Sequence, residues 1–304
     1  MVSVERILEL TQLPPEETKA MYAASTCPPP AWPSAGAITV KGMHLTYPNA
    51  KGPTLRDLSV HIPSKASTAI IGPSGSGKSS LTNVFFRLYT PEEKGTIAID
   101  GQAIDAMPLE ALRKKICLLP QQAGVFTGTV RFNLDACGEY TDDAIWRVIN
   151  KVGLRHRLVS HTSEASPDGL GLSIAQDGRG WSRGELQLLC MARALLKGSK
   201  IFFLDEPTSA IDPRLDDILQ NNLRHLFEDA TVVTVAHRLT TILDYDQILV
   251  VVNGRVHEMG TLRELMGLED GWLKNIVKEA GPEVTASVQQ ALEKHADAAS
   301  KKHA

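Results

Sequence analysis

Residues 70–80 read Ile-Ile-Gly-Pro-Ser-Gly-Ser-Gly-Lys-Ser-Ser, and this stretch constrains the fold more than any other. The apolar residues before the glycines are typical of a buried strand, and Leu81, Val84 and Phe85 after them share one side of a predicted helix. Glycines have no Cβ, so successive backbone N–H groups can turn inward around one anion. The N-terminus of the following helix directs its partial positive charge to the same place. The stretch therefore predicts a strand, a phosphate-binding loop and a helix, in an α/β fold.

The pattern G-x-x-x-x-G-K-[ST] gives each loop residue a role. Lys78 brings a mobile charge to the β- and γ-phosphates, and the Ser79 hydroxyl can ligate magnesium. The residues expected to bind the nucleotide are Gly72, Ser74, Gly75, Ser76, Gly77, Lys78, Ser79 and Ser80. A chance glycine-rich turn is the alternative, but the fixed positions arise by accident in roughly one chain in a hundred of this length. The strand before and the helix after make chance a still poorer explanation.

The composition fits a globular chain and argues against several other classes. The 304 residues, 43% of them apolar, are enough for one large α/β domain or two small ones. A net charge of −3 shows no basic excess, so no nucleic-acid partner is expected. The four cysteines lie far apart without a C-x-x-C pair, which favours reduced thiols over a disulfide frame or a zinc site. No apolar run approaches the roughly 18 residues of a membrane span, so we expect the chain itself to be soluble.

The other apolar runs predict a mostly parallel sheet with helices on both sides. Residues 37–47 and 55–62 alternate polar and apolar, as half-exposed antiparallel strands do. Shorter, continuous apolar runs indicate buried strands, and they alternate with helical segments. Strands are expected at 66–71, 95–101, 116–119, 200–206, 231–236 and 247–252, and helices at 109–115, 142–152 and 183–197. The polar, glycine-rich residues 160–180 favour an exposed loop.

The first 36 residues differ from the rest. Val4, Ile7 and Leu8 form a short apolar stripe of helical period. The proline-rich run at 28–33 predicts an extended backbone, because each proline fixes φ and removes a donor. We favour a stiff linker here over a ligand for a small adaptor domain.

Two carboxylates follow one of the buried strands directly. Asp205 ends the strand and Glu206 comes next, at the edge where ligands collect in open α/β sheets. Asp205 can hold magnesium opposite Ser79, and Glu206 can orient or deprotonate an attacking water, which contributes about 10²–10⁴ in rate. A simple turn is the alternative, which we disfavour downstream of a phosphate loop. His237 also follows an apolar strand, and only that position argues for a phosphate contact over a structural role.

These pieces together resemble one family, the ATP-binding cassette, which is the ATPase domain of ABC transporters. Residues 72–80 match its Walker A motif and 200–206 its Walker B motif, and the match runs from about Ala37 to Met266 with six motifs in family order. The resemblance implies a P-loop NTPase fold with a mostly parallel sheet core, an antiparallel β subdomain and an α-helical subdomain at about 125–195. It also assigns roles to Gln121 (Q-loop, serving magnesium and the membrane-domain contact), Ser209–Asp212 (D-loop), His237 (steadying the γ-phosphate) and Tyr47 (stacking on adenine). From the residues alone, Tyr47 fits an ordinary core or edge position equally well.

Residues 181–187, Trp-Ser-Arg-Gly-Glu-Leu-Gln, take the place of the family's LSGGQ signature and depart from it. Trp181, Arg183 and Glu185 stand where the family has Leu, Gly and Gln. The resemblance implies that Ser182, Gly184 and Glu185 approach the γ-phosphate held by an opposite domain. A carboxylate there is repelled by phosphate, and the repulsion is reduced if Glu185 folds back. Ser182 and Glu185 also form a capping-box pattern, which is the purely structural alternative.

The flanks narrow the resemblance to one subfamily. Residues 126–135, the leader at 2–7 and the proline-tryptophan linker resemble the second nucleotide-binding domain of subfamily C exporters, the multidrug-resistance and conjugate transporters. The layout this implies is a linker from a membrane domain at 1–36, an ABC ATPase domain at 37–269 and a C-terminal helical tail at 270–304.

The resemblance implies a magnesium-dependent ATPase, with ATP and Mg²⁺ as cofactors. Its expected partners are the transmembrane domains of an exporter and a second ABC ATPase domain in a head-to-tail dimer, at the cytoplasmic face of a membrane. One alternative is a soluble ABC ATPase acting on DNA or ribosomes, which would be expected to show a basic surface or a long insertion. The other is a regulatory protein that binds ATP without hydrolysing it, against which Glu206 and His237 argue.

Overall fold

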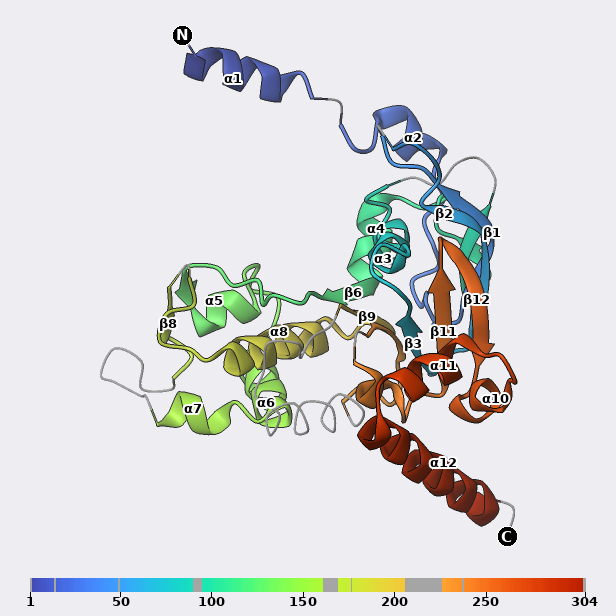
Figure 1. Cartoon of the computed structure of the whole chain (residues 1–304). Coiled ribbons are helices and arrows are strands. Elements are labelled where there is room, and N and C mark those ends of the chain that lie inside the picture. The colour runs from blue at the N-terminus through green and yellow to red at the C-terminus, as the bar shows by residue number, and fades with distance from the viewer. Residues whose placement is uncertain are drawn as a thin grey trace.

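The computed structural model describes residues 2–13, 15–48, 50–89, 95–160, 169–175, 177–205, 226–236 and 238–302. These residues form a central sheet, an antiparallel sheet beside it and a group of helices on the opposite side (Figure 1). Helix α1 (Val2–Thr11) extends away from one end of the molecule and α12 (Pro282–Lys302) from the other. The expected α/β class with a parallel core and two flanking parts is confirmed.

The central sheet has the strand order β12-β11-β3-β10-β9-β6 in the described part of the chain. Its strands are β12 (Arg255–Gly260), β11 (Gln247–Val252), β3 (Ser67–Ile71), β10 (Thr231–Val235), β9 (Ile201–Asp205) and β6 (Ile116–Leu119). The strands from β11 to β6 are parallel, and β12 is antiparallel to β11. The sequence did not predict β12, because this edge strand has no buried residue and therefore no apolar run.

The second sheet has the order β2-β1-β4-β5. It contains β1 (Ile38–Leu45), β2 (Leu55–Ile62), β4 (Thr96–Ile99) and β5 (Gln102–Ala103), all paired antiparallel. Its inner face packs on α3 (Lys78–Phe85) in one hydrophobic cluster. Phe85 of α3 and Phe203 of β9 join this cluster to the central sheet, with ring centroids 4.8 Å apart. Helix α3 therefore lies between the two sheets.

The helical part contains α5 (Val130–Leu134), α6 (Asp142–Val152), α7 (Arg155–Val159) and α8 (Arg183–Lys197). Side-chain caps at Thr141 and Ser182 begin α6 and α8, and left-handed glycines at 153 and 198 end them, so these bounds match the sequence prediction. Residues 160–180 were expected to form a loop. Within their described part, β8 (Ser173–Ile174) instead pairs with β7 (Gly128–Thr129), because Ile174 is fully buried under the helices.

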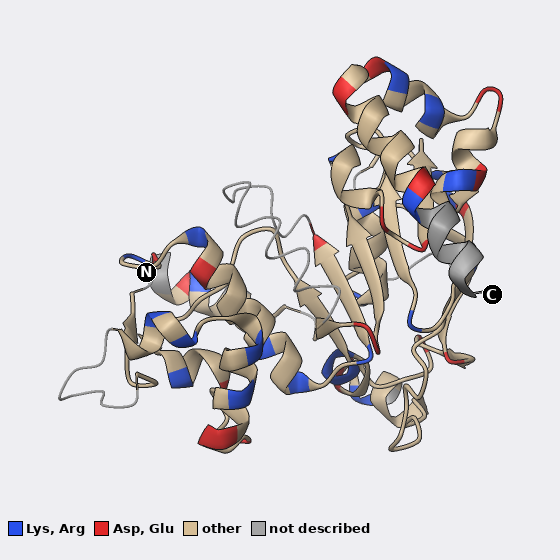
Figure 2. Cartoon of the chain, turned by 90° about the horizontal axis from the view of Figure 1, so that it is seen from below, with Lys and Arg blue, Asp and Glu red and all other residues tan. Residues whose placement is uncertain are grey.

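The C-terminal part covers β3 and β11 on the face of the central sheet opposite α3. Here α10 (Leu262–Gly267), α11 (Trp272–Glu279) and α12 share a cluster with β11 and with the 3₁₀ turn η1 (Leu239–Ile242). Leu273, Val277 and Val288 are its buried contacts from α11 and α12. Figure 2 shows that acidic and basic residues lie mainly on the outer helices and loops, whereas the central strands are mostly uncharged.

Residues 15–36 pack on the domain. The indole Nε1 of Trp32 donates to the carbonyl oxygen of Ile99 at 2.9 Å, and the Asp100 carboxylate accepts from the backbone N–H groups of residues 35–37 at 2.8–3.1 Å. The expected extended run at 28–33 is only partly correct. The N–H of Trp32 donates to the carbonyl oxygen of Pro29 at 2.9 Å and closes a turn, because Pro30 presets the φ that the second position of a turn needs.

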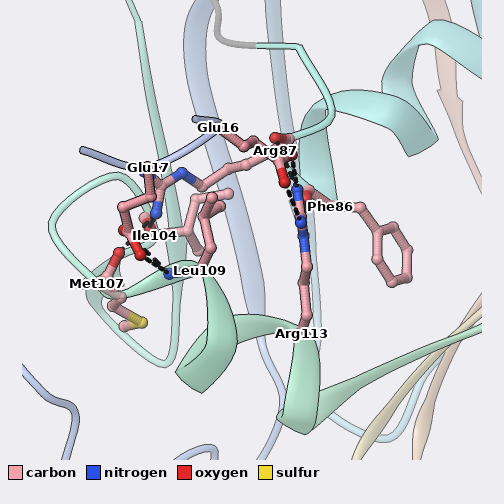
Figure 3. Close-up of polar contacts among 8 residues, drawn as sticks. All are labelled: Glu16, Glu17, Phe86, Arg87, Ile104, Met107, Leu109 and Arg113. Atoms are coloured by element: carbon pink, nitrogen blue, oxygen red, sulfur yellow. Dashed lines mark hydrogen bonds and ion pairs between the residues drawn. The ribbon is translucent and has the colours of Figure 1, made fainter. Parts of the chain in front are cut away.

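Two glutamates of this segment bind the helices beside it (Figure 3). Arg113 of α4 (Leu109–Lys115) forms a bidentate ion pair with the carboxylate of Glu16. Its Nε and Nη2 also donate to the carbonyl oxygens of Phe86 and Arg87, at 3.0 and 3.1 Å. The carboxylate of Glu17 accepts from the N–H of Leu109 at 3.2 Å, at the start of α4. The segment is thus attached to the end of α3 and to the helix that leads into β6.

In the described residues, no helix combines the length and the apolar character needed to cross a bilayer. All four cysteines are free: Cys190 is buried, Cys117 is partly buried, and Cys27 and Cys137 are exposed. Burial raises the pKa of the Cys117 and Cys190 thiols, which keeps both protonated at neutral pH.

Candidate functional site

The glycine loop joins the end of β3 to the start of α3, as predicted. A Cβ at Gly72 (φ 152°) would lie 2.0 Å from the carbonyl oxygen of Val251, and one at Gly77 (φ 101°) would lie 2.7 Å from the Leu55 side chain. Both positions therefore require glycine. The N–H of Gly254, in the turn between β11 and β12, donates to the carbonyl oxygen of Ser76 at 3.0 Å. The turn between β11 and β12 thus supports one side of the loop, whereas Ser74, Gly75 and Ser79 of the loop are exposed.

Lys78 is the first residue of α3 and is only 5% exposed. Its Nζ donates back across the loop to the carbonyl oxygens of Gly72 and Pro73, at 2.9 and 2.8 Å. The buried Ser76 hydroxyl has no hydrogen-bond partner in the structure, and a Cβ at Gly75 would meet open space. An ammonium and a buried hydroxyl at a helix N-terminus suit a phosphate group, because charge-assisted hydrogen bonds to it are stronger than those to carbonyls.

Strand register brings Asp205 to the same edge of the sheet as this loop. Ile70 of β3 pairs with Val235 of β10, and Val235 pairs with Asp205 of β9. Two strand spacings place the Cα atoms of Ile70 and Asp205 about 10 Å apart. On the next strand, Leu119 of β6 pairs with Leu204. The exposed Gln121 follows two residues later, so it lies just beyond the same edge of the sheet. The chain segments that follow β3, β9 and β6 therefore lie at one edge of the sheet.

The segment after Gln121 is held by side chains from α5 and α8. Asn133 bonds both the N–H and the carbonyl oxygen of Phe126, each at 2.8 Å. Arg193 donates to the carbonyl oxygen of Gly124 at 3.0 Å, and its guanidinium lies over the Phe126 ring. These contacts attach Gly124 and Phe126 to the helical part.

Tyr47 follows β1 and lies beside α3, the helix that follows the glycine loop. Its hydroxyl accepts from the Asn83 amide of α3 at 3.3 Å, and its ring meets the edge of Tyr89 with centroids 4.6 Å apart. The ring is partly buried against the core. The position is that of an edge aromatic attached to α3, which leaves adenine stacking a prediction.

The signature segment, whose sequence differs from the family pattern, forms a complete helix cap. The Ser182 hydroxyl accepts from the N–H of Glu185 at 3.2 Å, and the Glu185 carboxylate accepts from the N–H of Ser182 at 2.7 Å. Glu185 thus folds back, as the capping-box pattern predicted. Its other oxygen lies 3.2 Å from Nε of Arg157 on α7, a residue that the sequence did not single out. Gly184 is buried and Ser182 is exposed.

The signature segment does not lie with the loop of its own chain. Helix α8 has 15 residues and is about 22 Å long. It begins among the helices on one side of the molecule and ends beside β9, whereas β3 and α3 lie farther across (Figure 1). The predicted nucleotide residues therefore form two separate groups, one at the sheet edge and one at the start of α8.

Several predicted residues lie outside the part of the chain that the structure describes. They are Glu206, His237 and the D-loop at 209–212. Of their described neighbours, Asp205 ends β9 and Ala236 directly follows β10, at the edge discussed above.

The sequence also missed two residues that contact these groups. Gln187 reaches the backbone beside Gln121, and Arg157 holds the signature segment. Gln187 had a weak signal in its place two residues after Glu185, whereas Arg157, far from it in sequence, had none.

Comparison with known proteins agrees with this arrangement. A mouse protein, ATP-binding cassette sub-family C member 4, is 38% identical over 95% of this chain, and the Saccharomyces cerevisiae metal resistance protein YCF1 is 40% identical over 92%. The chain spans only 21% and 18% of these two proteins.

A solved structure of a bacterial Atm1-family ABC exporter with ATP bound superposes with a TM-score of 0.78 at 26% identity, covering 92% of this chain and 47% of that one. The family model described as ABC transporter matches residues 55–209, slightly more than half of the chain. The chain therefore belongs to the ABC transporter family and has the fold of the family's ATPase domain.

Proposed function

We propose that this chain is the magnesium-dependent ATPase part of an exporter. The observation that carries the proposal is the loop holding Lys78 and the unpartnered Ser76 hydroxyl, at the same sheet edge as Asp205. Lys78 and the loop amides would bind the phosphates, and Ser79, Asp205 and Gln121 would hold magnesium. Magnesium would supply positive charge against the β- and γ-phosphate oxygens.

Hydrolysis needs two further roles, which we assign from the sequence. Glu206, directly after Asp205, would orient the attacking water and accept its proton. His237, after β10, would donate a hydrogen bond to the γ-phosphate and keep it in line with that water. Tyr47, partly buried beside α3, would support the adenine.

We further propose that the working unit is a head-to-tail dimer. The separation of the signature segment from the loop of the same chain supports this, because Ser182 and Gly184 could then meet a phosphate only on a second domain. Binding of ATP would close the two domains, and hydrolysis would open them.

The membrane partner would dock beside Gln121. Leu118, Phe126 and Phe132 lie close to this glutamine in sequence and are 38%, 59% and 44% exposed, and exposed apolar side chains suit a protein contact. Because the chain spans about a fifth of its curated relatives, we propose that membrane domains belong to the whole assembly, with residues 1–36 leading from them, 37–269 forming the ATPase domain and 270–304 a helical tail. The assembly would act at the cytoplasmic face.

The proposal is tested with two measurements on the full chain. Calorimetry should find ATP binding that weakens when magnesium is chelated. Glu206→Gln should keep this affinity and remove turnover, while Glu279→Gln on the exposed side of α11 changes neither. Binding with unchanged turnover in Glu206→Gln would refute the base assignment, and absence of magnesium-dependent ATP binding would refute the function. The membrane role fails separately if no membrane-embedded protein co-purifies with the chain.

A further inference from the structure

The guanidinium of Arg157 contacts the signature segment both before and after Ser182. Arg157 of α7 donates through Nη2 to the carbonyl oxygen of Gly180, and its Cζ lies 5.0 Å from the centre of the Trp181 ring. Its Nε lies 3.2 Å from the Glu185 carboxylate, in an ion pair whose side chains are 19% and 27% exposed. Residues on both sides of Ser182 thus contact the same side chain, that of Arg157.

Two of these contacts use the residues that depart from the family pattern. Leucine in place of Trp181 offers no π face to a cation, and glutamine in place of Glu185 offers no charge to pair. The indole Nε1 of Trp181 also donates to the carbonyl oxygen of Ser173 at 3.4 Å, which fixes the ring that Arg157 stacks on. The two residues that differ from the family pattern, Trp181 and Glu185, are therefore linked through Arg157 of another helix.

The charge of Glu185 is satisfied on both oxygens. One accepts from the N–H of Ser182 and the other pairs with Arg157. Without the guanidinium, a carboxylate with one oxygen turned outward would stand next to Ser182, where a phosphate is to bind. The attraction within a partly buried ion pair is screened less by solvent than that within an exposed pair, so Arg157 offsets the charge of Glu185 more strongly than an exposed arginine would.

We propose that Arg157 is a positioning residue for the signature segment: it orients Ser182 and Gly184 and cancels the charge of Glu185, so that a segment containing Trp181 and Glu185 accepts the γ-phosphate of a nucleotide held by a second domain. This inference rests on the proposed function, because it requires that the segment meets a phosphate. It makes the three residues one matched unit, in which Arg157 is needed only because Trp181 and Glu185 are present.

The test is a cycle of variants assayed as the full chain, at rising concentration so that dimers form. Arg157→Ala should lower kcat at least tenfold with the affinity for Mg-ATP unchanged, since the phosphate loop is not touched. In the double variant Trp181→Leu with Glu185→Gln, the same Arg157→Ala change should alter kcat less than twofold. Arg157→Lys keeps the charge and should restore part of the activity. Arg155→Ala is the matched control, because Arg155 lies on the same helix and stacks on Trp146 instead.

An equal loss from Arg157→Ala in both backgrounds would show a merely structural arginine and overturn the inference, as would no loss in the natural background. A second readout does not need turnover. Arg157→Ala should speed amide hydrogen exchange at residues 181–186 at least tenfold in the natural background and not in the double variant. If the parent chain binds Mg-ATP without hydrolysing it, the proposed ATPase fails, and exchange still decides the positioning role. Unchanged exchange in Arg157→Ala refutes that role whether or not the chain hydrolyses ATP.

Discussion

The side-chain amide of Gln187 on α8 donates to the carbonyl oxygen of Pro120 at 3.3 Å. Pro120 directly precedes Gln121, and Gln187 lies two residues after Glu185, so one hydrogen bond ties the signature helix to the segment at the Asp205 edge. Gln187 is only 3% exposed, which makes the bond difficult for water to replace. The two groups of predicted nucleotide residues are thus connected within one chain.

Gln187→Leu should break this connection while keeping the volume of the side chain. We expect a loss of about 1 kcal/mol in the free energy of unfolding, because the Pro120 carbonyl loses its donor. We also expect lower kcat with unchanged affinity for Mg-ATP, measured by steady-state hydrolysis and calorimetry. Gln290→Leu, at an exposed position of α12, is the control. If both variants behave alike, the bond has no role in coupling.

Lys78→Ala should weaken Mg-ATP binding at least tenfold, or about 1.4 kcal/mol, because the only ammonium placed over the loop in the described residues is removed. Titration calorimetry measures the affinity. Lys65→Ala is the matched control, since its ion pair with Asp229 is 57% and 76% exposed and should matter little for stability or binding. An Lys78→Ala protein that binds ATP as tightly as the parent would remove Lys78 from the site.

Asp100→Asn should loosen the attachment of residues 34–37. Burial raises the pKa of the Asp100 carboxyl, but the backbone N–H groups of residues 35–37 outweigh it and hold the pKa below its ordinary 3.8. A lowered pKa means that the carboxylate stabilises the fold above pH 3.8 and that this stability is lost as the pH falls through the folded value. We expect Asp100→Asn to lose about 1–2 kcal/mol at pH 7.

Asparagine keeps the left-handed backbone of this position (φ 48°), so the variant changes the carboxylate without straining the chain: it removes the charge and one of the two accepting oxygens. In chemical denaturation, the difference between parent and variant should shrink below pH 3.8. A difference that stays constant with pH would contradict the role of the charge.

Arg113→Ala should destabilise the chain more than Glu16→Ala. The Arg113–Glu16 pair is 30% and 53% exposed, so losing Glu16 should remove at most about 0.5 kcal/mol. Losing Arg113 also leaves the carbonyl oxygens of Phe86 and Arg87 without this donor, which adds about 1–2 kcal/mol. Equal losses in denaturant titrations would show that the ion pair, and not the bonds to the end of α3, is what stabilises this contact.

Local signals made several elements predictable from sequence. Helices α4, α6 and α8 have the expected bounds, because residues such as Ser182 and Gly198 begin and end a helix through their own backbone conformation and hydrogen bonds. Strand β12 was missed because it has no buried residue, although it pairs with the neighbouring strand β11. The docking of residues 15–36 was missed for a different reason. Its contacts join residues far apart, such as Glu16 and Arg113, and no local pattern encodes which distant partner a side chain will meet.

The phosphate loop was determined by the sequence alone, because the conformations open to glycine and the N-terminus of a helix act within a dozen residues. Only the tertiary structure decided which other groups share its edge: the register of parallel strands brings Asp205 and Gln121 there, while the length of α8 keeps Ser182 apart. The folding-back of Glu185 follows from a local cap, but its pairing with Arg157 depends on how α7 packs against α8. That packing depends on the buried surface of the whole helical part, which no short motif specifies.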